Sequence, residues 1–385
     1  MKQRVIEWVK KETVLSVAAV LAVISMMLVK PDAAYGGYVD DKTLAMLFCL
    51  MLVMAGFQKL GVFAAMGESL INRVNGEKGI AAVLVFLCFF TSMVITNDVA
   101  LITFVPFALT VLALAGLERL VIPVVILQTI AANLGSMLTP IGNPQNLYLY
   151  GKAGMGAGEF VGLMLPYVGL AGAMLLVCVM CLKCGGGVAV QENEATDSRE
   201  QRELHKVSQT NSKQSQLRLA AYLVLFALCI GTVAHLLPWP ILLAVVSIVM
   251  LLLDRELFKR VDYALLATFA AFFIFIGNMG RVPVFYEFLN RVVQGNEVAV
   301  SVLASQIISN VPAALLLSGF TDHWQGLIIG TNLGGLGTLI ASMASLISYK
   351  NIVRAYPEKK GVYLLWFTVA NVGFLMLMFA YEMIV

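Results

Sequence analysis

Two short polar motifs interrupt long apolar stretches of this 385-residue chain, and their residues are the ones best suited to bind a ligand. The first is Thr96-Asn97-Asp98 and the second is Ser309-Asn310-Val311-Pro312. The helix expected after each motif presents unbonded N–H groups and a partial positive charge at its N-terminus, which suits an anion. The amides of Asn97 and Asn310 add further donors and acceptors. Helix capping or helix–helix adhesion is the alternative role for these residues.

Two longer segments combine helix breakers with oxygen ligands. They are Asn133-Leu134-Gly135-Ser136-Met137-Leu138-Thr139-Pro140-Ile141-Gly142-Asn143-Pro144 and Gly330-Thr331-Asn332-Leu333-Gly334-Gly335-Leu336-Gly337-Thr338. Repeated Gly and Pro within an apolar stretch favour an interrupted helix, here near 133–144 and near 330–338. Unwound carbonyls together with Asn and Thr oxygens are hard ligands that suit Na⁺. Close helix packing is the alternative function of any single glycine.

The composition indicates where these motifs lie. Hydrophobic residues make up 60% of the chain and charged residues only 13%, whereas soluble domains carry about 25% charged residues. The apolar residues form contiguous runs of the length that crosses a bilayer. The 26 basic and 23 acidic residues nearly balance, so no polyanion-binding surface and no nucleic-acid partner are expected. The chain is therefore predicted to be an all-α polytopic membrane protein.

Both tip motifs fall where an apolar run would otherwise cross the membrane. We predict that 79–116 and 297–320 each form a re-entrant hairpin, because non-helical backbone at that depth must lie against protein or a watery cavity. The other apolar runs then make about nine full spans. With a cytoplasmic N-terminus, 21 of the 26 Lys and Arg residues fall in cytoplasmic segments and five in external ones, as the positive-inside rule requires. The C-terminus is expected outside.

The polar signals recur in the same order in two halves of the chain. Residues 1–184 form the first predicted transmembrane repeat and residues 217–385 the second, with tips near 96–98 and 309–312. Residues 185–216 are polar, have no apolar period and are expected to be a flexible cytoplasmic linker. Corresponding spans run in opposite directions in the assigned topology. The halves are therefore predicted to be inverted repeats, the architecture of many secondary transporters.

Asp98 is the only formal charge that this topology places deep in the membrane. A carboxylate near the bilayer centre costs about 2.5–3.5 kcal/mol on insertion scales, so it normally faces a cavity. The sequence offers no Lys or Arg within the apolar core to pair with it. Asp98 is therefore expected to be neutralised by a proton or a bound cation, or to be solvated. Capping of the helix that follows is the alternative role.

Four motifs in this order resemble the repeat signatures of the ion transporter superfamily. That superfamily includes arsenite permeases, citrate transporters, divalent-anion/sodium symporters and a sodium/proton antiporter branch. The resemblance covers nearly the whole chain outside the linker. The motifs that carry it are Thr96-Asn97-Asp98-Val99-Ala100, Thr139-Pro140-Ile141-Gly142-Asn143-Pro144, Ser309-Asn310-Val311-Pro312-Ala313 and Gly330-Thr331-Asn332-Leu333-Gly334.

The resemblance implies a role for each tip position. In the dicarboxylate symporters each tip is Ser-Asn-Thr, whose Asn and Thr are implied to hold substrate carboxylates while Ser, Asn and nearby carbonyls hold Na⁺. The first position of each tip would thus take the sodium role and the second a shared role. The third positions here are Asp98 and Val311, which lack the hydroxyl. The first tip therefore looks more like the arsenite-permease tip.

These considerations define the expected site. The expected substrate-binding residues are Asn97, Asp98, Thr139, Pro140, Asn310, Val311 and Thr338. The expected ion-coupling residues are Thr96, Asp98, Asn133, Ser309 and Asn332. Sodium would bind at Thr96, Asn97 and Asn133 and at Ser309, Asn310 and Asn332.

The predicted function is secondary active transport of a small inorganic or organic anion across the plasma (inner) membrane, coupled to Na⁺ or H⁺, by alternating access. Arsenite-type efflux or Na⁺/H⁺ antiport is the alternative within transport. An enzyme is not expected, because neither H-E-x-x-H nor G-x-S-x-G occurs. A channel is disfavoured, because a pore favours one continuous polar lining. No cofactor is expected besides the coupling ion. The expected partners are a small anionic substrate and membrane lipid, and the sequence leaves a homodimer open.

Overall fold

The computed structural model describes residues 12–183 and 212–385, and all regular structure in these ranges is helical. The predicted linker at 185–216 lies outside the described residues up to position 211, and a helix already begins at Ser212. The helices before the linker are α2 (Thr13–Leu28), α3 (Asp41–Lys59), α4 (Val62–Ile71), α5 (Glu77–Ser92), α6 (Asn97–Leu114), α7 (Val121–Gly135), α8 (Pro144–Ala153) and α9 (Ala157–Met180). Those after it are α11 (Ser212–Val233), α12 (Trp239–Asp254), α13 (Tyr263–Met279), α14 (Pro283–Val293), α15 (Glu297–Ile308), α16 (Asn310–Leu317), α17 (Trp324–Leu333), α18 (Met343–Ala355) and α19 (Lys360–Glu382).

Six helical segments of the described ranges are long and apolar enough to cross a membrane, and α7 is among them only together with the 3₁₀ turns at its two ends. A seventh candidate is the pair α13 and α14, whose axes differ by 105° across a break between Met279 and Pro283. The sequence did not predict this bent pair. The predicted class, an all-helical multi-pass membrane protein, is thus confirmed. Several runs expected to span are short helices or are divided by non-helical backbone, so length and composition alone give fewer spans than the predicted nine.

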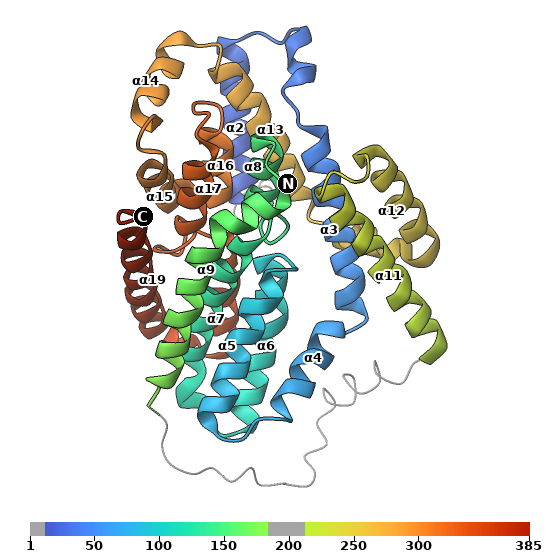
Figure 1. The fold of residues 1–385 in the computed structure, drawn as a ribbon, viewed down its shortest axis with the longest axis vertical. Helices are drawn as coiled ribbons and strands as arrows, with labels where there is room; N and C mark the ends of the chain where they lie inside the picture. The colour runs from blue at the N-terminus through green and yellow to red at the C-terminus, as the bar shows by residue number, and fades with distance from the viewer. Residues whose placement is uncertain (1–11, 184–211) are drawn as a thin grey trace, which may run out of the picture.

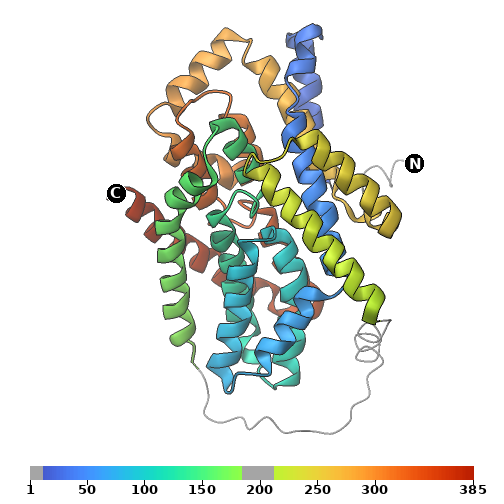
Figure 2. The same ribbon diagram turned by 45° about the vertical axis from the view of Figure 1, so that its right-hand side comes forward.

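The two hairpins that carry the tip motifs lie in different halves of the molecule. Helices α5, α6 and α7 occupy the lower half, whereas α15, α16 and α17 lie in the upper half (Figure 1). Helices α3, α11 and α12 form a separate group on one flank, and α9 and α19 lie on the other (Figures 1 and 2). The groups meet through α6 on α18 and α16 on α8. Each hairpin therefore contacts the interrupted helix of the other half of the chain.

Both hairpins form, and their turns differ. In the first, α5 ends at Ser92 and α6 begins at Asn97. In the second, Ser309 alone separates α15 from α16, and its φ of 74° and ψ of 154° are values that residues other than glycine rarely adopt. A tight turn held in this conformation stores strain beside the residues predicted to bind the ligand.

Both interrupted helices are present as well. The first break runs from Ser136 through Asn143 and includes one 3₁₀ turn. The second break begins at Gly334, later than the predicted 330, because residues 330–333 remain helical in α17. A Cβ at Gly330 would lie 2.7 Å from the Cα of Val298. Gly330 therefore serves close packing of α17 on α15, the alternative role considered for these glycines.

A glycine at the end of each first segment lets the neighbouring hairpin approach. A Cβ at Gly135 would lie 2.1 Å from the carbonyl oxygen of Phe89 in α5, and one at Gly334 would lie 2.5 Å from the hydroxyl of Ser305 in α15. Neither glycine needs a positive φ. Their lack of a side chain is what allows each hairpin to pack directly on the helix that breaks beside it.

We expect Gly135→Ala to lower the stability of the purified protein by about 1–3 kcal/mol, the usual penalty for overpacking a tight interface. The added methyl group would meet backbone, which cannot rotate away. Thermal unfolding in detergent measures the effect. Gly169→Ala is the matched control, because Gly169 is also helical and has no atom within 4 Å of the position of a Cβ. Equal unfolding temperatures for the two variants would contradict the packing argument.

Candidate functional site

The asparagine at each hairpin tip is the first residue of its helix and ties that helix to an unwound segment. The Asn97 side-chain oxygen accepts from the N–H of Asp98 at 2.9 Å, and that of Asn310 accepts from the N–H of Val311 at 3.0 Å. The backbone N–H of Asn97 donates to the carbonyl of Gly142 at 3.2 Å. The corresponding N–H of Asn310 donates to the carbonyl of Ala341 at 2.9 Å. Both tips are thus built in the same way.

Buried amides join the two halves of the chain. The side-chain oxygen of Asn133 accepts from the amide of Asn97 and from the hydroxyl of Ser342, both at 3.0 Å. Asn143 donates to the side-chain oxygen of Asn332 at 3.4 Å, and Asn332 donates to Asn146 at 2.7 Å. Each interrupted helix therefore contributes an asparagine that contacts the start of the second segment of the other one.

The amide oxygens predicted to bind sodium already accept hydrogen bonds, so they could bind a cation only through lone pairs that these hydrogen bonds do not use. They are the side-chain oxygens of Asn97, Asn133, Asn310 and Asn332. The hydroxyl of Thr96 has no hydrogen bond in the described structure, and α6 begins there without a side-chain cap. The part of the chain that the structure describes holds no group of three His, Cys, Asp or Glu residues suited to a metal. Any Na⁺ would thus be held by neutral oxygens with at most the carboxylate of Asp98.

In the part of the chain that the structure describes, several buried polar atoms beside this network lack a hydrogen-bond partner. They are the amide nitrogen of Asn133, the side-chain oxygen of Asn143 and both amide atoms of Gln145. Buried polar groups are normally hydrogen-bonded, and an orphaned group costs about 1–3 kcal/mol. The oxygen of Asn143 is the informative one, because Asn143 also lines a cavity. An acceptor without a donor at that position suits a cation, a protonated ligand or water.

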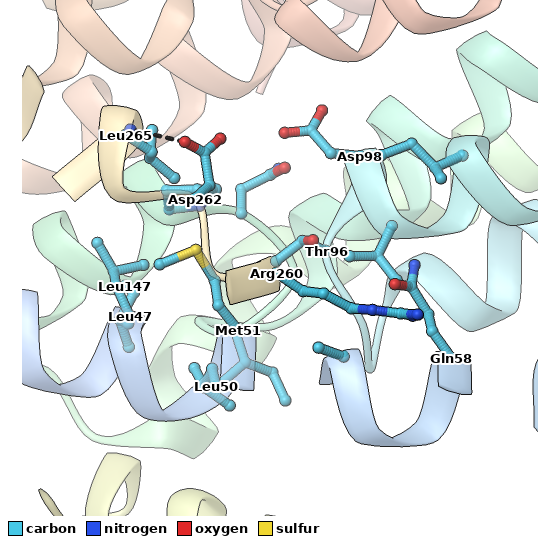
Figure 3. A pocket seen from close by; sticks show the side chains of 16 residues that line it. Leu47, Leu50, Met51, Gln58, Thr96, Asp98, Leu147, Arg260, Asp262 and Leu265 are labelled. Atoms are coloured by element: carbon cyan, nitrogen blue, oxygen red, sulfur yellow. Dashed lines mark hydrogen bonds between the residues drawn. The ribbon is translucent and has the colours of Figure 1, made fainter. Parts of the chain in front are cut away.

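The cavity has a volume of about 160 Å³ and lies between the first hairpin tip, helix α3 and the start of α13. Thr96, Asp98 and Asn143 line its tip side, and Gln58, Arg260 and Asp262 line the opposite wall. The carboxylates of Asp98 and Asp262 face one another, whereas the guanidinium of Arg260 extends toward Gln58 and Thr96 (Figure 3). Positive and negative groups are therefore separated within one small space.

Arg260 is a basic residue on the wall of the cavity that Asp98 also lines. It belongs to a loop and not to an apolar run, so the expectation that no Lys or Arg within the apolar core pairs with Asp98 is not contradicted. Arg260 is the last residue of the 3₁₀ helix η4 (Arg255–Arg260), which lies between α12 and α13. The fold brings this segment to the cavity beside the first hairpin tip. No ion pair joins the two residues, so the half-buried carboxylate of Asp98 stays without a hydrogen bond or salt bridge in the described structure. Asp98 does not cap α6, whose N-cap position is Thr96 and which has no side-chain cap in the described structure.

The remaining predicted residues lie apart from the cavity. Thr139 donates to the carbonyl of Met93, and Pro140 is buried beside it. Asn310 and Val311 are buried at the second tip, where the Ser309 hydroxyl donates to the carbonyl of Ala341 at 3.3 Å. Asn310 and Val311 of the second tip do not line the cavity, and neither does Thr338. The structure thus brings Thr96 and Asp98 to the cavity and holds the second tip behind the amide network.

Thr338 is exposed and is positioned by a residue that sequence reasoning missed. Its N–H donates to the side-chain oxygen of Gln306 at 2.9 Å. The amide nitrogen of Gln306 also donates to the carbonyls of Gly334 and Leu336, at 3.1 and 3.0 Å. One side chain thus satisfies the unwound backbone of the second break. A lone glutamine on an apolar helix was the only available signal, and it did not indicate this partner.

The sequence profile of the citrate transporter family matches residues 5–322. The chain is 32% identical over 319 residues to inner membrane protein YbiR of Escherichia coli, covering 81% of this chain and 80% of that protein. It is 30% identical over 320 residues to the uncharacterized transporter MJ0456 of Methanocaldococcus jannaschii, covering 81% of each. A shorter match, 28% identical over 172 residues, covers 44% of this chain and 35% of the silicon efflux transporter LSI3 of Oryza sativa.

Proposed function

Because the chain belongs to the citrate transporter family, we propose that it moves a small anion across the inner membrane by secondary active transport, coupled to Na⁺ or H⁺. Membership confirms the resemblance to the ion transporter superfamily, and it identifies a multi-pass membrane transporter and not an enzyme. Citrate and related carboxylates are the first substrates to consider.

The observation that carries this proposal is the matched construction of the two tips. Asn97 and Asn310 are each the first residue of a helix that begins within the protein, each accepts from the N–H of the next residue, and each donates its N–H to a broken helix. Helix N-termini inside a membrane protein suit an anionic group. Asn97 is linked through the side chains of Asn133 and Ser342 to the segment whose Ala341 carbonyl accepts from Asn310, so a ligand at the first tip can affect the arrangement of the second.

The same contacts support the proposal of two inverted repeats. Asn97 with Gly142 corresponds to Asn310 with Ala341, and Asn133 with Ser342 corresponds to Asn332 with Asn143. Such pairs of equivalent contacts are expected when two copies of one unit pack about an approximate two-fold axis. We infer that alternating access occurs by movement of the paired hairpins and broken helices against the flank group α3, α11 and α12 together with α13.

Transport into proteoliposomes tests the function directly. Uptake of radiolabelled citrate, succinate, phosphate and arsenite is measured with Na⁺ and pH gradients imposed separately. A secondary transporter shows saturable uptake of at least one anion that follows one of these gradients. Flux that does not saturate and responds to neither gradient would contradict the proposal and would point to a channel.

Cation transport is the second candidate, and the pairing of Asp98 with Asp262 across the cavity favours it. Two facing carboxylates repel each other and are stabilised by a shared proton or cation. This arrangement would serve Na⁺/H⁺ antiport or the efflux of an uncharged oxyacid in exchange for a proton. Fluorescent measurement of proton movement on addition of Na⁺, arsenite or silicic acid, with no anion gradient, distinguishes this function from anion symport.

We propose the predicted topology, with the N-terminus cytoplasmic and the C-terminus external. A cysteine at Asn75 is then expected to be protected from an impermeant maleimide in intact cells, and one at Ala33 is expected to react. Both positions are exposed in the structure, so access and not burial decides the outcome. The unmodified protein supplies the background from its native cysteines. Labelling at Asn75 without labelling at Ala33 would reverse the orientation.

A further inference from the structure

The cavity beside Asp98 has two chemically different ends. Asp98 and Asp262 lie at one end, and Arg260 extends to the other, where Gln58 and Thr96 are its neighbours on the cavity wall (Figure 3). We propose that Arg260, Gln58 and Thr96 form a subsite for an anionic carboxylate, leaving the Asp98 end for the coupling cation. This inference rests on the proposed function and names the residues on the flank that recognise the substrate's charge.

Arg260 is available for a ligand. Within the described structure its guanidinium makes no hydrogen bond and no ion pair, and neither do the Gln58 amide and the Thr96 hydroxyl. Three other arginines of the described chain are engaged in ion pairs, for example Arg281 with Asp32 at 2.8 Å, and Arg260 differs from the remaining unpaired arginines in that it lines the cavity of Asp98. Guanidinium groups bind carboxylates through two parallel hydrogen bonds. An unpaired arginine with an amide and a hydroxyl at the same end of the cavity therefore offers complementary donors for a carboxylate.

The arginine is held in place by its surroundings. Lys59, which follows Gln58, binds both carboxylate oxygens of Asp254 at 2.9 and 2.7 Å, and the Asp254 side chain is only 5% exposed. Asp254 immediately precedes η4. Beyond η4, Asp262 caps α13 by accepting from the N–H of Leu265 at 2.9 Å. Both ends of the segment are thus fixed to helices, so Arg260 projects from an anchored support.

The subsite resolves an electrostatic conflict in the cavity. Ionised Asp98 repels an anion that lies close to it, whereas the guanidinium of Arg260 attracts that anion. A carboxylate at the Arg260 end has its counter-charge beside it and lies away from the carboxylate pair. A cation or proton between Asp98 and Asp262 then removes the remaining repulsion. Binding of the anion and of the cation should therefore support each other.

Citrate binding to the purified protein tests this subsite. We expect Arg260→Gln to raise the citrate Kd, measured by calorimetry in detergent, by about tenfold, and Arg260→Lys to raise it less. Asp262→Asn should lower the Kd, because it removes a negative charge and asparagine still caps α13. Arg255→Gln is the matched control, since Arg255 is an exposed arginine of the same segment and does not line the cavity.

The outcomes separate this inference from the proposed function. If the unmodified protein takes up citrate in proteoliposomes and Arg260→Gln changes its Kd no more than Arg255→Gln does, the subsite is wrong and the function stands. A rise in Kd for Asp262→Asn would also contradict it. If the unmodified protein neither binds nor transports citrate, the proposal of a citrate-like substrate fails together with the subsite. Size-exclusion profiles and unfolding temperatures establish that each variant is folded.

Discussion

Replacing Asn97 or Asn310 by alanine is expected to abolish transport and to leave a folded protein. Each side chain accepts a hydrogen bond in the first turn of its helix, at the junction between a hairpin and a broken helix. Loss of one such hydrogen bond costs about 1 kcal/mol, which a large helical protein tolerates. We expect each amide to contact the ligand or the coupling ion during the transport cycle, so the effect on transport should be far larger than the effect on stability.

Asn371→Ala is the matched control for these two variants. Asn371 is fully buried, but its amide nitrogen donates only to the carbonyl of Phe367 within its own helix. Uptake rates and unfolding temperatures are compared for the three variants. Normal transport by Asn97→Ala or Asn310→Ala would reduce that asparagine to a structural role in the first turn of its helix. A loss of transport in Asn371→Ala that matches the other two would mean that any buried amide matters equally.

Asp98→Asn is expected to change ion coupling more than anion binding. A unit anion about 5 Å from an ionised carboxylate at an effective dielectric near 20 is repelled by roughly 3 kcal/mol, a factor of more than one hundred in affinity. Asparagine has nearly the same shape and no charge, so it imitates the neutralised form. The variant should therefore bind citrate as well as the unmodified protein does, or more tightly, and should lose its response to the coupling ion.

The coupling ion decides which response is lost. If the proton is coupled, uptake by Asp98→Asn should no longer follow an imposed pH gradient; if Na⁺ is coupled, the dependence on sodium should weaken. Asp41→Asn, at the exposed start of α3, is the control for loss of a carboxylate elsewhere. A variant with the rate, pH response and sodium response of the unmodified protein would place the coupling site away from Asp98, at Thr96, Asn133, Ser309 or Asn332.

The sequence by itself determined the class of protein and the places where its helices break. Composition indicates a membrane protein, because so few charges cannot cover a water-soluble surface. Asn, Gly and Pro within apolar runs indicate the tips and the first interrupted helix, because these residues disfavour the helix interior through their local backbone preferences. Local preferences suffice for such predictions, and α6 does begin at Asn97 and α8 at Pro144.

Only the tertiary structure decided which residues meet. Gly330 lies in a helix because α15 packs closely against it, so an apparent breaker is a packing residue. Gln306 finds its carbonyl partners across a break 28 residues away. Arg260 belongs to a polar loop with no local sign of a role, yet it lines the cavity of Asp98. Contacts between distant segments depend on how helices pack against one another, and no property of the residues near Arg260 in the sequence specifies the hairpin tip that it faces.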